Sequence, residues 1–92
     1  MKRNLLNWRK VKRLVIKRDN GLCVLCGALA VDVHHVKFRS QGGKDDVRNC
    51  VCLCRKCHEM AHGLHKYISA KEVKAILMEY LEKKAHIEKK GE

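Results

Sequence analysis

The sequence has no long apolar run, no proline and few acidic side chains. Near its N-terminus the longest apolar stretch is Leu14-Val15-Ile16, which lies between charged residues and predicts no secretory signal. No segment approaches the roughly 20 apolar residues that a membrane span needs. Repeats and low-complexity tracts are also absent. These absences argue against a membrane protein, and we expect a cytoplasmic protein with no membrane partner.

The shortage of acidic residues leaves a large positive charge. Ten Asp and Glu residues stand against 21 Lys and Arg residues, for a formal net charge of +11. A field of this sign and size favours polyanions, and nucleic acid first among them. Charge alone leaves a merely soluble basic surface equally open. An acidic membrane surface is a third partner, but the sequence offers no cleanly amphipathic helix with a large apolar face.

Two cysteine pairs compensate for the small size of the chain. A domain of 92 residues is poorly stabilised by apolar burial alone, and a structural metal is a usual remedy. In a reducing compartment, Cys23-x-x-Cys26 and Cys54-x-x-Cys57 supply four thiolates, which complete a tetrahedral zinc site. The 27 residues between Cys26 and Cys54 exceed the spacing of a simple zinc ribbon and leave room for a hairpin.

Local patterns predict an α+β fold. Leu5, Trp8, Val15 and either Val11 or Leu14 form roughly one face of a first helix, which Asp19-Asn20-Gly21 ends. We expect Trp8 and Tyr80 in the core, and Cys50 and Cys52 as small buried hydrophobes. In chain order the predicted elements are a helix over 2–18, a strand over 31–36, a loop over 40–46, a strand over 50–53, a helix over 55–62, and a helix from the Ser69-x-x-Glu72 capping box to about His86.

Histidines lie between and after the cysteine pairs, where a zinc ribbon does not use them. His58 and His62 are four residues apart and share one face of a predicted helix, a geometry that offers two imidazoles to one ion. His34 and His35 are neighbours on a predicted strand, so their side chains point to opposite faces. We therefore expect one of them to bind the ion and the other to do something else. His65 is an alternative ligand.

In the order and spacing of these motifs, the chain resembles the HNH endonucleases, the ββα-metal nucleases. The resemblance is nearest to the small phage and bacterial type with a four-cysteine zinc. It covers about residues 18–62 of what we expect to be one domain over residues 1–92. It implies a ββα core, made of a hairpin and a helix. A four-cysteine zinc stabilises this core, and N- and C-terminal helices flank it. The matching residues are Cys23-x-x-Cys26, Val33-His34-His35-Val36, Gly42-Gly43, Asn49 and Cys54-x-x-Cys57-His58.

The resemblance implies a role for each catalytic residue. His34 matches the metal ligand on the first strand, and His35 matches the general base. His58 matches the helix-borne ligand, and His62 matches a third ligand that some branches possess. Asn49 matches the asparagine whose side chain hydrogen-bonds across the loop and holds the hairpin, so that a nearby backbone carbonyl orients the base. Together they imply metal-dependent hydrolysis of DNA.

The chemistry fits these residue types. An imidazole titrates near neutral pH and is suited to deprotonate water, while one divalent cation neutralises charge that develops on the phosphate. We expect this cation to be Mg²⁺, Mn²⁺, Ni²⁺ or Zn²⁺. Neutral imidazoles preserve its charge, whereas four thiolates cancel the charge of a zinc ion, so the cysteine zinc is expected to be structural. Without an added reader domain, sequence specificity should be low. The stand-alone type also suggests phage packaging proteins as partners, with restriction and mobile-element roles equally open.

Other residues are weaker candidates. Asp32 shares a strand face with His34 and is placed to orient an imidazole. Lys37, Arg39, Arg48 and Arg55 flank the expected site and are candidate phosphate contacts, with solvated surface as the alternative for each. A rival function is a catalytically silent zinc module that only binds nucleic acid. The presence of a base and of the loop asparagine argues against it, because DNA binding requires neither. A redox or metal-storage protein is a more distant alternative.

Overall fold

The computed structural model describes the backbone of residues 4–90 and the side chains of residues 4–85. Lys2 and Arg3 of the predicted first helix, the side chain of His86 and both ends of the expected domain therefore lie outside the described residues. The described part confirms the α+β class. Its elements are α1 (Leu5–Arg18), β1 (Asp32–His35), the short 3-10 helices η1 (Arg39–Gln41) and η2 (Val47–Asn49), β2 (Cys50–Leu53), α2 (Arg55–Ala61) and α3 (Ala70–Lys90).

Helix α1 begins and ends on local capping groups. At its start, the side chain of Asn4 accepts a hydrogen bond from the backbone N–H of Asn7 at 3.0 Å. At its end, Asn20 and Gly21 have φ values of 57° and 67°, and the N–H of Gly21 donates to the carbonyl of Ile16 at 2.9 Å. This left-handed turn confirms the predicted helix end, since such turns satisfy the last carbonyls of a helix.

The buried face of α1 is narrower than the sequence predicts. Val11 and Val15 are buried and Trp8 is half-buried, but Leu5 and Leu14 are 66% and 46% exposed. The expectation that Leu5 lies on the buried face was therefore wrong, and of the two alternatives for the middle position Val11 is the buried one. The reason is that α1 packs on a sheet of only two strands, which covers a thin stripe of the helix.

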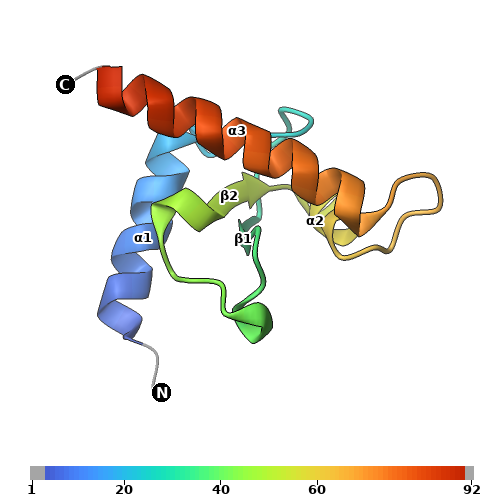
Figure 1. Ribbon diagram of the computed structural model, residues 1–92, viewed down its shortest axis with the longest axis horizontal. Coiled ribbons are helices and arrows are strands. Elements are labelled where there is room, and N and C mark those ends of the chain that lie inside the picture. The colour runs from blue at the N-terminus through green and yellow to red at the C-terminus, as the bar shows by residue number, and fades with distance from the viewer. Residues whose placement is uncertain (1–3, 91–92) are drawn as a thin grey trace.

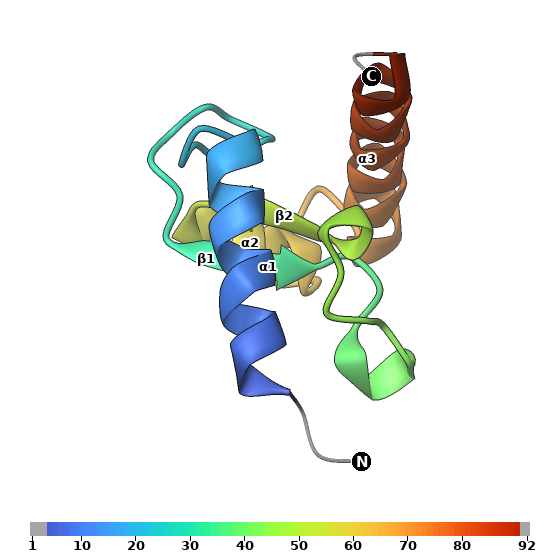
Figure 2. The same ribbon diagram turned by 90° about the vertical axis from the view of Figure 1, so that its left-hand side faces the viewer.

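Strand β2 is the centre of the fold. It pairs antiparallel with β1, with His34 opposite Val51 and Val33 opposite Cys52, and all four of its residues are buried. The sheet lies between α1 on one side and α3 on the other (Figure 2). Alternate residues of β2 therefore face two different apolar clusters. Cys50 and Cys52 face α1 as small buried hydrophobes, as predicted, and burial raises the pKa of each thiol to about 11.

Helices α2 and α3 complete the other side of the sheet (Figure 1). The capping box of α3 is confirmed: the N–H of Glu72 donates to Ser69 Oγ at 3.1 Å, and this hydroxyl donates to Glu72 Oε1 at 3.2 Å. The helix continues past the predicted end, to Lys90. Among its described side chains, over residues 70–85, those of Val73, Leu77 and Leu81 are buried. Within residues 4–90 we find no helix with both the length and the apolar character needed to cross a membrane.

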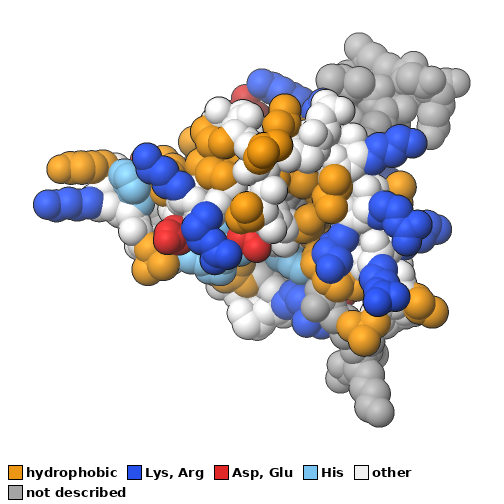
Figure 3. Space-filling view, turned by 180° about the vertical axis from the view of Figure 1, so that it is seen from behind, with side chains coloured by type: hydrophobic (Ala, Val, Ile, Leu, Met, Phe, Trp, Pro, Cys, Tyr) orange, Lys and Arg blue, Asp and Glu red, His pale blue; other side chains and the backbone are white. Residues whose placement is uncertain are grey.

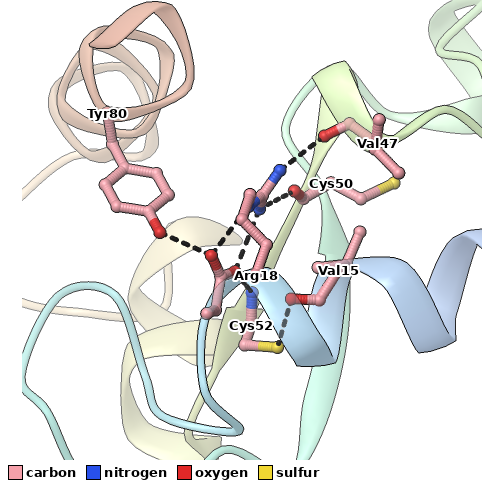
Figure 4. Close-up of polar contacts among 7 residues, drawn as sticks. Val15, Arg18, Val47, Cys50, Cys52 and Tyr80 are labelled. Atoms are coloured by element: carbon pink, nitrogen blue, oxygen red, sulfur yellow. Dashed lines mark hydrogen bonds and ion pairs between the residues drawn. The ribbon is translucent and has the colours of Figure 1, made fainter. Parts of the chain in front are cut away.

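A buried ion pair ties α1, β2 and α3 together (Figure 4). The carboxylate of Asp19 accepts hydrogen bonds from Arg18 Nε at 2.8 Å, from the N–H of Cys52 at 3.0 Å and from the hydroxyl of Tyr80. Arg18 also donates to two backbone carbonyls, one in η2 and one in β2, at 2.7 Å each. Burial alone would raise the pKa of Asp19, but these hydrogen bonds outweigh it and lower the pKa. Tyr80 is thus part of the fold, as predicted.

Candidate metal centres

The four paired cysteines converge on one point. Their sulfur atoms all lie within 4.8 Å of one another, and all are free thiols. The Sγ atoms of Cys26 and Cys54 are 3.6 Å apart. In a tetrahedral site with Zn–S bonds of about 2.3 Å, sulfur atoms are about 3.8 Å apart. The cluster therefore fits a zinc ion, and it joins two segments that are distant in the sequence.

Each cysteine pair is placed by its own backbone. The first pair lies in a tight turn, in which the N–H of Gly27 donates to the carbonyl of Cys23 at 2.9 Å and Gly27 has a φ of 81°. A glycine suits this turn because other residues rarely adopt a positive φ. The second pair opens α2, where Cys54 is the N-cap and its sulfur accepts from the N–H of Cys57 at 3.5 Å.

The thiols of the cluster are not equally acidic. Burial raises the pKa of Cys23, but backbone N–H groups of Cys54, Cys26 and Leu25 outweigh it and lower the pKa to about 7. Burial and the neighbouring sulfurs raise the pKa of Cys57. One thiolate therefore forms readily and further thiolates are opposed by it. A bound dication removes this opposition, which is the physical reason for gathering four cysteines around a metal.

A second cluster consists of three histidines. His34 from β1, His58 from α2 and His62 from the end of α2 have ligand atoms within 4.8 Å of one another. The Nε2 atoms of His58 and His62 are 3.1 Å apart. Nitrogen ligands about 2.0–2.1 Å from a tetrahedral ion are about 3.3 Å apart. Among the described residues this group does not include His65, the alternative ligand, whose Nδ1 accepts from the N–H of Tyr67 at 3.2 Å.

Neighbouring side chains set the orientation of these imidazoles. Asp32 Oδ2 is 2.8 Å from His58 Nδ1, which leaves Nε2 of the same ring facing the cluster. The ring of His62 stacks on Phe38 with centroids 4.9 Å apart, and Phe38 also meets the ring of His34 edge-on. Asp32 therefore orients an imidazole, as its strand position suggested, and the imidazole is that of His58.

Burial and mutual repulsion keep two of the three imidazoles neutral. His34 is only 4% exposed, and burial, followed by the nearby His58 and His62, lowers its pKa to about 3. Burial and His58 also lower the pKa of His62. At neutral pH both rings are unprotonated, which is the form that binds a metal. The cluster therefore fits a divalent ion.

His35 diverges from His34 but meets the same cavity. Its ring stacks on Trp8 with centroids 4.7 Å apart, and its Nε2 lies 2.7 Å from Asp45 Oδ1. A cavity of about 480 Å³ is nevertheless lined by His35, the last residue of β1, together with the three clustered histidines. The imidazoles of His34 and His35 therefore line the same cavity although the two side chains diverge.

Asp45 is a site residue that the sequence reasoning missed. We expected a backbone carbonyl to orient His35, whereas the partner in the structure is this loop carboxylate. Arg39 Nε lies 3.5 Å from the same oxygen. The available signal was an acidic residue in the segment between the histidine pair and Asn49. Acidic residues are common in loops, however, and their position in the sequence does not show which group they will contact.

Asn49 holds the loop as expected. Its Oδ1 accepts from the N–H of Lys37 at 2.8 Å, and its Nδ2 donates to the carbonyls of Lys37 at 3.0 Å and Lys44 at 3.1 Å. The chain approaches itself closely here, since a Cβ on Gly43 would lie 1.7 Å from the carbonyl oxygen of Lys37. Only glycine fits at that position.

The four candidate phosphate contacts are all exposed, but they do not gather at one place. Arg39 lines the histidine cavity. Lys37 and Arg48 instead line a separate cavity of about 520 Å³ against α3. Arg55 is the first residue of α2, next to the cysteine cluster. Of the four, the structure brings Arg39 to the histidines.

Comparisons with known proteins agree with this geometry. A model of the HNH endonuclease family matches residues 23–63, a range that holds every residue of both clusters, and also His35 and Asn49. The chain is also 37% identical, over an alignment of 62 residues, to the type IV methyl-directed restriction enzyme EcoKMcrA of Escherichia coli (strain K12). That alignment covers 56% of this chain and 22% of the restriction enzyme, so the chain spans less than a quarter of this relative.

Proposed function

We propose that the protein is a nuclease that hydrolyses DNA phosphodiester bonds with one divalent ion, because a model of the HNH endonuclease family matches residues 23–63. The observation that carries this proposal is the shared cavity of about 480 Å³. It is lined both by the three-histidine cluster, which suits a metal, and by a fourth imidazole, His35, which is free of that cluster. The four-cysteine cluster holds the structural zinc.

The histidine cluster supplies the electrostatic part of the reaction. His34, His58 and His62 would bind an ion through imidazole nitrogens, which carry no negative charge, so they would leave the charge of the ion undiminished. When bound, a divalent ion supplies Lewis-acid stabilisation of the negative charge that develops on the phosphate and on the leaving oxygen. Asp32 keeps His58 turned with Nε2 inward through its 2.8 Å contact with Nδ1.

His35 serves as the general base. With Asp45 accepting the hydrogen of Nε2, the other ring nitrogen, Nδ1, is an unprotonated acceptor and takes a proton from water. The stacked ring of Trp8 holds the imidazole in place. The same carboxylate then stabilises the imidazolium that forms. Asn49 supports the contact between His35 and Asp45 indirectly, because its hydrogen bonds fix the loop that carries Asp45.

The substrate is DNA. The net charge of +11 favours a polyanion, and Arg39 lines the cavity, where its guanidinium can contact a phosphate of the substrate. The relative is named as methyl-directed, but this chain spans only 22% of it. We therefore carry over no recognition property from the relative, and we propose for this chain the cleavage step with low intrinsic sequence specificity.

Cleavage of supercoiled plasmid tests the proposal. We expect nicked or linear product when Mg²⁺, Mn²⁺ or Ni²⁺ is added to the zinc-loaded protein, and loss of this activity in His58→Ala. Glu59→Ala is a matched control, because Glu59 is an exposed residue of the same helix that belongs to neither cluster, and it should cleave normally. Should the wild-type chain bind DNA but leave it intact with each of these ions, the non-catalytic zinc module would be the correct function.

A further inference from the structure

The loop between α2 and α3, residues 62–69, projects from the body of the molecule (Figure 1). It carries two of the most exposed apolar side chains of the described residues: Tyr67 is 84% exposed and Leu64 is 75% exposed. Seen from behind, the projecting lobe combines hydrophobic, basic and histidine side chains (Figure 3). Neither residue contributes to the core clusters, so folding does not account for their apolar character.

The loop is anchored at both ends. At its start the N–H groups of Gly63 and Leu64 donate to carbonyls of α2, each at 3.0 Å. At its end the Ser69 capping box fixes the first turn of α3. Between these anchors the N–H of Tyr67 donates to His65 Nδ1 at 3.2 Å. These contacts hold the loop in an extended position, so the tyrosine ring is presented to solvent and does not fold back onto the helices.

This loop is continuous with the histidine cavity. It begins at His62, one of the three clustered histidines, and ends where α3 presents Lys71 and Lys74. These lysines line a second cavity, of about 280 Å³, which His34 and Phe38 also line. A DNA strand that occupies the histidine cavity can therefore extend into this second cavity, toward Lys71 and Lys74.

The charge of the loop matches a polyanion. Residues 62–71 contain no Asp or Glu, but they contain Lys66 and Lys71. The Nζ of Lys66 lies 6.0 Å from the centroid of the Tyr67 ring. Exposed aromatic rings beside basic side chains are the pattern by which proteins hold unstacked bases and the phosphates that flank them.

We propose that the α2–α3 loop is a DNA-contacting element in which Tyr67 stacks on a base close to the bound phosphodiester, with Lys66 and Lys71 on the adjacent phosphates. The proposal rests on the proposed function in taking DNA as the ligand, but it does not require cleavage. Its readout is therefore chosen to be binding and base unstacking.

The test uses the full chain, loaded with zinc and without a second divalent ion. Binding is measured by fluorescence anisotropy on a duplex that contains 2-aminopurine, whose emission changes when the base leaves its neighbours and stacks on another ring. Tyr67→Ala should weaken binding roughly 5- to 150-fold, the worth of stacking on one base, and should reduce the change in 2-aminopurine emission on binding. Tyr67→Phe keeps the ring and should retain both. Leu29→Ala is the matched control, since Leu29 is 79% exposed and lies outside this loop.

Each outcome decides the proposal. It is overturned if Tyr67→Ala binds the duplex as tightly as Leu29→Ala does, or if no variant changes the 2-aminopurine signal. It is also overturned if sedimentation shows a self-association that Tyr67→Ala abolishes while DNA affinity is unchanged, because the loop is then an interface between copies. A wild-type protein that binds and unstacks DNA but never cleaves it would refute the nuclease function and leave the role of the loop supported.

Discussion

Replacement of Asp19 by alanine should destabilise the protein strongly. The Asp19 side chain is fully buried and the Arg18 side chain is 12% exposed. The substitution removes the carboxylate that accepts from Arg18, Tyr80 and the N–H of Cys52. It leaves a guanidinium without its counter-ion and a buried N–H without an acceptor. Both losses oppose folding, because buried polar groups that lose their partners are not rehydrated.

The magnitude follows from these contacts. Removal of one partner of a buried ion pair costs about 3–5 kcal/mol. The lower end applies, because Arg18 keeps its two carbonyl acceptors in η2 and β2, and because the half-buried hydroxyl of Tyr80 can bind water. For a domain of this size, a loss of about 3 kcal/mol lowers the Tm by roughly 12–24 °C. Tyr80→Phe removes a single hydrogen bond from the same network and should cost about 1 kcal/mol.

Thermal unfolding of the zinc-loaded protein is the assay, with circular dichroism as the signal. Glu82→Ala is the control, because it removes the same charge from an exposed position on α3 and should change stability by less than about 0.5 kcal/mol. Equal Tm values for Asp19→Ala and Glu82→Ala would refute the reasoning. The buried network would then contribute nothing that packing alone does not supply.

The same carboxylate predicts a dependence of stability on pH. Its hydrogen bonds lower the pKa of Asp19 below the ordinary value of 3.8, so near that pH the unfolded chain binds more protons than the folded protein. The stability that Asp19 contributes is therefore present above pH 3.8 and is lost as the pH falls through the lower folded pKa. Asp19→Ala should lack this part of the acid dependence. Denaturant unfolding of the two proteins at a series of acid pH values measures the difference.

Three further predictions concern the candidate sites. Cys54→Ser should lose bound zinc and cooperative unfolding together, because structural zinc contributes folding energy directly; metal analysis and a melt measure this, and a native transition without zinc would contradict it. His35→Ala should keep calorimetric binding of the second ion and slow plasmid cleavage by on the order of 10²–10⁴-fold, whereas His34→Ala should weaken the ion so that extra Mn²⁺ partly restores cleavage; the reverse pattern would exchange the two roles. Gly43→Ala should destabilise the loop, since its Cβ would lie 1.7 Å from the Lys37 carbonyl oxygen, and an unchanged melt would show that the loop gives way at no cost.

Much of the site could be predicted because its signals are local. Cys-x-x-Cys pairs and two histidines four residues apart express the geometry of a tight turn and of one helical turn, which do not depend on the rest of the chain. The same holds for the capping box at Ser69 and for the left-handed turn at Asn20 and Gly21 that ends α1. The structure of a short segment that has only one favourable conformation can be predicted from its own residues. The cytoplasmic location and the packaging partners have no such local signal and stay predictions.

The tertiary structure alone decided which distant groups meet. Asp45 contacts His35 across ten residues, Asp32 contacts His58 across 26, and Tyr80 reaches Asp19 across 61. Periodicity also placed Leu5 on a buried face that the two-stranded sheet is too narrow to cover. Such partners are selected by how the helices pack on the sheet and by the need to satisfy every buried charge. Both conditions act on the assembled chain, so the sequence determined which groups are available to bind metals, and the fold determined how those groups are oriented.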